Sequence, residues 1–117
     1  MSEYVYTLPV PPSANRYWRI YHNRMVVTDE ARTYKQEIAL LLRGAIPLTG
    51  RVAVNFSVFR PRLSGDLDNY NKVMFDALQG LAYRNDNQIV EIHSFRKDDK
   101  YNPRVEFLVS DELDGYE

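Results

Sequence analysis

The segment from Arg51 to Phe59 limits the possible folds more than any other part of this sequence. Small or polar side chains alternate there with large apolar ones, at Val52, Val54, Phe56 and Val58. A period of two is typical of a strand with one buried face. We therefore expect a central β-strand here, and other segments have to complete its sheet and cover its apolar face.

The remaining elements are predicted from their own periodicity. Shorter alternations predict three further strands, at residues 3–8, 88–96 and 105–109. Apolar residues spaced three and four apart predict two helices, at residues 28–42 and 68–81. Residues 20–27 are typical of a short β-ribbon. The main order, β-α-β-α-β-β, predicts an α+β fold with two helices packed on one face of a mixed sheet.

Size and composition narrow the class of protein. At 117 residues the chain suits one core, so we expect a single domain over residues 1–117, with 111–117 as a frayed acidic tail. The absence of cysteine excludes disulfides, thiolate zinc sites and a cysteine nucleophile. No apolar run is as long as a membrane span, and the first residues do not resemble a signal peptide. We therefore expect a cytoplasmic protein with no membrane partner.

Charge is unevenly distributed along the chain. Four of the 16 acidic residues lie in the last seven positions, so residues 1–110 carry 15 basic and 12 acidic side chains. No acid occurs between Tyr4 and Thr28 or between Ile38 and Gly65, and both stretches contain arginines. A polyanionic partner fits this distribution, and so does a set of unrelated solvent-exposed arginines.

Two carboxylates, Asp66 and Asp68, follow the second of these stretches. At about 4 Å and an effective dielectric of about 20, two such charges repel by roughly 4 kcal/mol, which a bound divalent cation offsets. Residues i and i+2 point to different sides of a helix, so we place both aspartates in the turn that enters the second helix. Because the chain has no thiolate, oxygen ligands favour Mg²⁺ or Mn²⁺.

Asp86 and Lys72 are the other groups expected around that cation. Lys72 lies one helical turn after Asp68 and can hold a phosphate oxygen. Asp86 follows the helix, which spans about 20 Å, so it reaches the pair only if residues 83–87 fold back or a second subunit supplies it. A purely structural explanation is also open, in which the aspartates are caps and turn residues and Lys72 forms i,i+4 ion pairs with Asp68 and Asp76.

Residues 13–19 interleave polar, cationic and aromatic side chains directly after a proline-rich turn. Arginine combined with tyrosine or tryptophan is typical of surfaces that bind single-stranded or distorted nucleic acid. In the alternative, Tyr17 and Trp18 fill the core while Arg16 and Arg19 lie in solvent. Both interpretations remain open from the residues alone.

Taken together, these motifs resemble the RusA-type Holliday junction resolvases, a family of crossover junction endodeoxyribonucleases often encoded by prophages. The resemblance covers nearly the whole chain in order and length. It is carried by residues 11–19, 66–69, 72, 75–78 and 85–90. One departure is Gly65, where the family can carry a basic residue; Arg60 or Arg62 is the candidate replacement.

The resemblance implies a homodimeric cytoplasmic enzyme of bacterial or prophage origin. Such an enzyme binds four-way DNA junctions and nicks two opposed strands in recombination and repair, using Mg²⁺, which Mn²⁺ can replace, and no small-molecule cofactor. Asp66, Asp68 and Asp86 match its metal-binding catalytic carboxylates and Lys72 matches its catalytic lysine, in a site formed at the dimer interface. The implied DNA contacts are Asn15, Arg16, Arg19, Arg60, Arg62, Asn69 and Lys72.

Two other functions fit the same residues. A non-catalytic nucleic-acid-binding module would use residues 15–19 and would bind without a metal ion. A metal-dependent phosphohydrolase would act on small nucleotides and would be indifferent to junction structure. The products formed with and without a divalent ion separate these three functions.

Overall fold

The structure is a computed structural model that describes residues 2–60 and 67–112, apart from the side chains of residues 67 and 68. Its main sheet has four strands in the order β1-β6-β4-β5. Their bounds are β1 Glu3–Leu8, β4 Val52–Arg60, β5 Ile89–Asp98 and β6 Arg104–Ser110. Strand β4 is paired on both sides, antiparallel to β6 and parallel to β5. The predictions of a central strand and a mixed sheet are confirmed.

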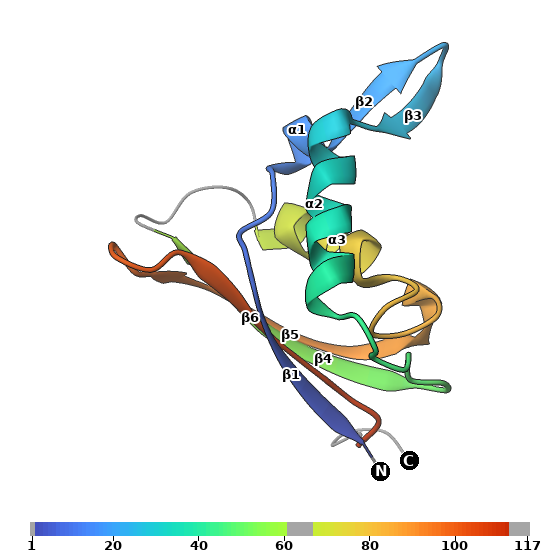
Figure 1. Cartoon of the computed structure of the whole chain (residues 1–117), viewed down its shortest axis with the longest axis vertical. Helices are drawn as coiled ribbons and strands as arrows, with labels where there is room; N and C mark the ends of the chain where they lie inside the picture. The colour runs from blue at the N-terminus through green and yellow to red at the C-terminus, as the bar shows by residue number, and fades with distance from the viewer. Residues whose placement is uncertain (1, 61–66, 113–117) are drawn as a thin grey trace.

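The two long helices, α2 (Asp29–Leu41) and α3 (Leu67–Leu78), lie on the same side of this sheet (Figure 1). The Thr28 hydroxyl caps α2 by accepting a hydrogen bond of 3.1 Å from the Ala31 N–H. Helix α3 begins one residue before Asp68, so Asp68 lies in its first turn and not in the turn before it. The helix ends earlier than the expected Leu81, and Gly80 adopts a positive φ of 86° two residues beyond it.

Apolar side chains of the sheet and helices form one core. Phe56, from β4, stacks on Phe107 from β6 at 5.4 Å between ring centroids and meets the edge of Phe75 from α3 at 6.1 Å. The prediction of an α+β fold is therefore confirmed. The surface of α3 opposite this core takes no part in the packing. None of the described helices is both long enough and apolar enough to span a membrane.

The structure adds elements that the six-element order left out. Residues expected to form a loop instead include a four-residue helix, α1 (Ala14–Tyr17), which makes three α-helices among the described residues, not two. One turn is too short for apolar periodicity to reveal. The expected ribbon is confirmed as β2 (Trp18–Tyr21) paired antiparallel with β3 (Arg24–Val27).

The start of the carboxyl-terminal tail is bonded to the amino-terminal end of the chain. Ser2 and Asp111 exchange two hydrogen bonds, with the Ser2 N–H 2.6 Å from the Asp111 carboxylate and the Asp111 N–H 3.1 Å from the Ser2 carbonyl. Asp111 is therefore bonded to the residue that precedes β1, and the expected frayed acidic tail over 111–117 stays a prediction. Residues 113–117 lie outside the described residues.

Candidate active site

Helix α3 carries three of the predicted site residues, Asp68, Asn69 and Lys72. Its apolar face is fully anchored in the core by Tyr70, Val73, Met74, Ala77 and Leu78. On the opposite face Asn69 and Lys72 are exposed, and the backbone of Asp68 lies one turn before Lys72. Burial of one face therefore holds the other in a fixed orientation towards solvent. Asp66 and Arg62 lie outside the described residues.

Asp76 fixes α3 against the other two helices. The phenol of Tyr17, which is fully buried, donates a hydrogen bond of 2.5 Å to Asp76 Oδ2, and Lys35 Nζ lies 3.4 Å from the same oxygen. Burial, followed by the bond to Asp76, raises the pKa of Tyr17 above its ordinary 10.0, so the phenol remains a donor. The purely structural explanation paired Lys72 with Asp76, but Asp76 binds Tyr17 and Lys35 instead.

Asp86 begins a short 3₁₀ helix, η1 (Asp86–Gln88), which is held by its own capping box. The Asp86 N–H donates to the Gln79 side chain at 3.0 Å, and Gln79 directly follows α3. The Gln88 amide donates to the carbonyls of Leu48 and Gly50, both at 2.9 Å. These bonds fix Asp86 at the carboxyl-terminal end of α3.

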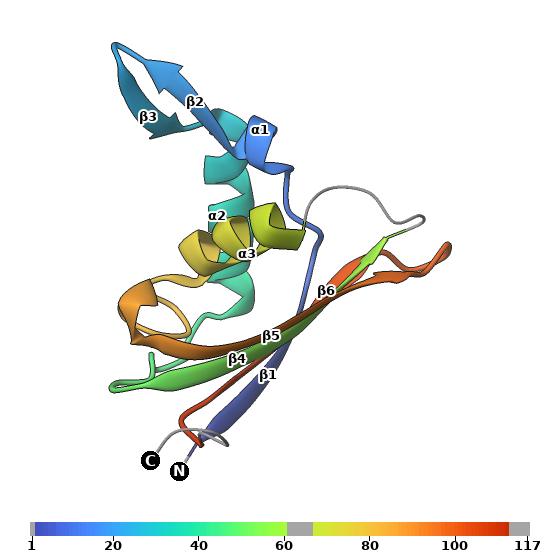
Figure 2. The ribbon, with the colours of Figure 1, turned by 180° about the vertical axis from the view of Figure 1, so that it is seen from behind.

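Asp68 and Asp86 consequently lie near opposite ends of α3. At 1.5 Å per residue, Asp68 and Leu78 are about 15 Å apart along the α3 axis. Figure 2 shows the yellow-green start of α3 and the orange η1 turn at its two ends. Residues 83–87 do not fold back to the start of the helix. Among the described residues, no three His, Asp or Glu side chains form a group that could hold a metal ion.

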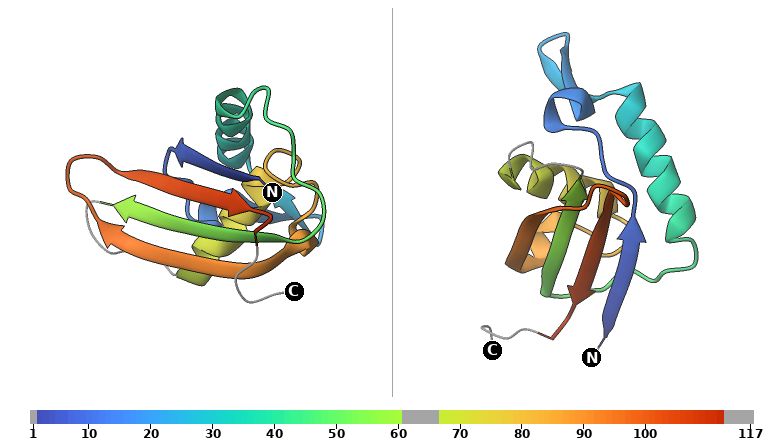
Figure 3. Two further views of the ribbon diagram at one scale, coloured as in Figure 1. Left: turned by 90° about the horizontal axis from the view of Figure 1, so that it is seen from below. Right: turned by 90° about the vertical axis from the view of Figure 1, so that its left-hand side faces the viewer.

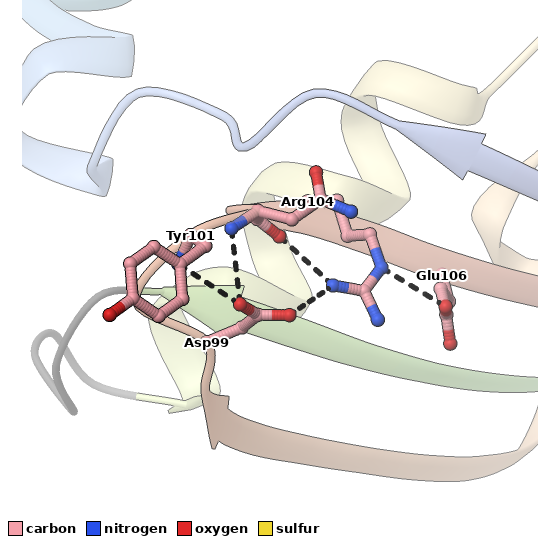
Figure 4. Close-up of polar contacts among 5 residues, drawn as sticks. Asp99, Tyr101, Arg104 and Glu106 are labelled. Carbon is pink, nitrogen blue, oxygen red and sulfur yellow. Dashed lines mark hydrogen bonds and ion pairs between the residues drawn. The ribbon is translucent and has the colours of Figure 1, made fainter.

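The loop between β5 and β6 fixes the end of β4, from which the chain leads towards Asp66. The Asp99 N–H donates to the Arg60 carbonyl at 2.7 Å. The Asp99 carboxylate accepts bonds from the N–H groups of Tyr101 and Asn102 at 3.1 Å and from Arg104 at 2.8 Å (Figure 4). The Arg104 guanidinium, more than the two backbone donors, holds the pKa of Asp99 below its ordinary 3.8.

Two of the predicted DNA-binding arginines, far apart in sequence, meet at one cavity. A cavity of about 580 Å³ lies between the β1–α1 connection and α2, and both Arg16 and Arg60 line it. Arg16 is ion-paired with Glu30 at 2.8 Å, and Glu37 also lines the cavity. The two acids reduce the positive charge of this cavity. Asn15 is exposed on α1, and Arg19 lies beyond it on the β2–β3 ribbon.

Sequence comparison identifies the family. Residues 9–110 match the family described as Endodeoxyribonuclease RusA. The chain belongs to the RusA family. Every candidate site residue named above falls within the matched range.

Three RusA-family relatives carry the name crossover junction endodeoxyribonuclease RusA. The protein of Escherichia coli O139:H28 (strain E24377A / ETEC) is 36% identical over 94 residues, which cover 77% of this chain and 78% of the relative. The proteins of Enterobacteria phage 82 and Escherichia coli (strain K12) are 31% and 32% identical over 116 residues, covering 95% of this chain and 97% of each relative. The predicted resemblance is confirmed.

Asn71 is a site candidate that sequence reasoning missed in this RusA-family chain. Within the described part of the structure, its side-chain oxygen Oδ1 is buried and has no hydrogen-bond partner. A buried acceptor left unpaired typically costs about 1–3 kcal/mol, so Asn71 is a candidate ligand-binding residue. Only its position between Asp68 and Lys72 could have revealed it. Together with the aspartates it offers the carboxylate and carbonyl oxygens that Mg²⁺ prefers, so the donor chemistry fits this cation.

Proposed function

We propose that this protein is a metal-dependent endodeoxyribonuclease that resolves four-way DNA junctions by paired, symmetric nicking in recombination and repair. The observation that carries the proposal is the match of residues 9–110 to an endodeoxyribonuclease family, a range that contains Asp68, Lys72 and Asp86. Lys72 is exposed on α3 and forms no ion pair with Asp76, which binds Lys35 instead. This supports a catalytic and not a structural role for Lys72.

Asp66 and Asp68 are proposed to hold Mg²⁺ or Mn²⁺ together with Asp86. When bound, such an ion stabilises the attacking and leaving oxygens of a phosphodiester during in-line hydrolysis. Lys72 binds a non-bridging phosphate oxygen and offsets the charge that develops there as water attacks phosphorus and one P–O bond breaks. Arg60, Arg62 and Asn69 position the backbone of the same strand, while Asn15, Arg16 and Arg19 hold the adjoining duplex.

We propose further that a second subunit supplies the third carboxylate. The roughly 15 Å of helix between Asp68 and the end of α3 keeps Asp86 of the same chain away from the first turn. A two-fold dimer in which the start of one α3 faces the end of the other would complete two equivalent sites. Two equivalent sites suit a junction, which presents two equivalent strands for cleavage.

The test is a nicking assay on a mobile four-way junction, with Mg²⁺ or with EDTA. We expect paired nicks only with the metal, and a loss of at least about a hundredfold in nicking by Asp68→Asn with binding retained. Asp29→Asn is the matched control, because Asp29 is exposed at the start of α2 and its carboxylate pairs with the exposed Arg32. Binding without any nicks under all divalent ions would favour the non-catalytic module instead.

A further inference from the structure

The β2–β3 ribbon projects from the start of α2, away from the sheet and the core. It stands at the top of the right-hand view in Figure 3, opposite the strands of the main sheet. Trp18 and Val27 pack against the core at its base, and the Thr28 N–H donates to the Tyr17 carbonyl at 3.0 Å. His22 and Asn23 close its tip with φ values of 51° and 60°, as a tight two-residue hairpin turn requires.

Strand register gives the ribbon two different faces. Residues directly opposite each other in an antiparallel pair lie on the same face. One face pairs Arg19 with Val26 and Tyr21 with Arg24, and the Arg19 guanidinium lies 5.6 Å from the Tyr21 ring centroid. The other face pairs Trp18 with Val27 at the base and Ile20 with Met25 beyond it. The ribbon therefore has a cationic–aromatic face and an apolar face.

The cations of this ribbon are not neutralised within the chain. Across residues 2–60 and 67–112, neither Arg19 nor Arg24 forms an ion pair, whereas Arg16 is bound to Glu30. No acidic residue occurs between Tyr4 and Thr28. The ribbon is thus a positively charged projection whose arginines are available to a partner.

The outer half of the apolar face is also not packed against any other described element. Ile20 is 74% exposed and Met25 is 68% exposed, although they lie directly opposite each other. A two-stranded ribbon is at best marginally stable in water without packing on a further element. A partner that has both charged phosphates and apolar sugar and base surfaces can contact the cationic face and the apolar face of the ribbon together.

We propose that the β2–β3 ribbon is a DNA-binding arm that lies in a groove of the duplex next to the cleavage site. The major groove of B-DNA is about 12 Å wide and accepts a two-stranded β-ribbon. Arg19 and Arg24 contact phosphates along one groove wall while Ile20 and Met25 lie against the base edges and sugars. This inference rests on the proposed DNA substrate, and it assigns Ile20, Tyr21, Arg24 and Met25 to the DNA-binding surface alongside Arg19.

The first test measures binding of a fluorescent four-way junction in EDTA at several salt concentrations. The Arg19→Gln/Arg24→Gln double variant should bind about tenfold more weakly at moderate salt, and its slope of log affinity against log salt should fall by about two. Arg43→Gln is the matched control, because Arg43 is exposed beyond the opposite end of α2. Unchanged affinity and slope in the double variant would overturn the proposal. Failure of the unmodified protein to bind junctions would instead refute the proposed function.

The second test separates DNA from a protein partner for the apolar face. The Ile20→Ser/Met25→Ser variant should bind the junction more weakly while keeping the salt slope of the unmodified protein, because no phosphate contact is lost. Its sedimentation without DNA should be unchanged. A smaller species in sedimentation would show that the apolar face covers a second copy of the chain, and so would overturn its assignment to DNA.

Discussion

A substitution at Lys72 can distinguish an effect on the free energy of unfolding from an effect on catalysis. Its expected partner Asp76 is bound by Tyr17 and Lys35, and Lys72 itself is exposed. We expect Lys72→Met to leave the free energy of unfolding within about 0.5 kcal/mol of the unmodified protein, as for most surface changes. Junction nicking should fall by about a hundredfold or more, because a donor to a developing charge is lost. Single-turnover assays and urea unfolding measure the two effects, with Lys100→Met, at an exposed position between β5 and β6, as control. A large loss of stability with little loss of nicking would return Lys72 to a structural role.

Tyr17, unlike Lys72, is expected to contribute to the stability of the fold. It is fully buried, and its phenol is the only described contact between α1 and the Asp76 carboxylate. Tyr17→Phe should lower the free energy of unfolding by about 1.5–3 kcal/mol, the range for a hydrogen bond to a charged group. Tyr101→Phe should have no measurable effect, since Tyr101 is 88% exposed. Equal unfolding midpoints in urea for the two variants would show that the Tyr17–Asp76 bond does not hold α3.

Among the elements, the β5–β6 loop depends on the charge of Asp99. The pKa of Asp99 is lower in the folded protein than in the unfolded chain. The ionised carboxylate therefore stabilises the fold above the ordinary pKa of 3.8, and this stabilisation is lost as the pH falls through the lowered pKa of the folded protein. The urea midpoint of the unmodified protein should therefore fall more steeply on acidification below about pH 4 than that of Asp99→Asn. Asp98→Asn, an exposed neighbour, should follow the unmodified protein. Parallel curves for the unmodified protein and Asp99→Asn would contradict the assignment.

Elements with a long, regular pattern could be predicted from sequence, and short or irregular ones could not. The alternation in β4 and the apolar spacing of α3 each extend over many residues, so side-chain burial dictated them. Helix α1 has only one turn, and its conformation depends on Tyr17 reaching Asp76 across the fold. The position of Asp86 likewise depends on Gln79 and on the bonds from Gln88 to the Leu48 and Gly50 carbonyls, and the last two join segments far apart in the sequence.

At the scale of the whole molecule, the separation of Asp68 and Asp86 along α3 favours the proposed dimer, in which two chains form each site. No group of three possible metal ligands occurs among the described residues, which do not include Asp66 or the side chain of Asp68. An isologous dimer resolves this, because each site would combine Asp68 of one subunit with Asp86 of the other. Metal binding would then be linked to dimerisation, and dilution below the dimer dissociation constant would abolish nicking together with the dimer.

A mixed dimer tests this arrangement directly. Asp68→Asn and Asp86→Asn should each be inactive alone, but a heterodimer of the two, purified through different affinity tags, should have one intact site and one doubly altered site. We expect about half of the unmodified number of sites, seen as single nicks in place of paired ones. If each site lies within one chain, both sites of the heterodimer carry a substitution and no nicking appears. Pairing Asp68→Asn with the Asp68→Asn/Asp86→Asn double variant is the control, because neither arrangement leaves an intact site.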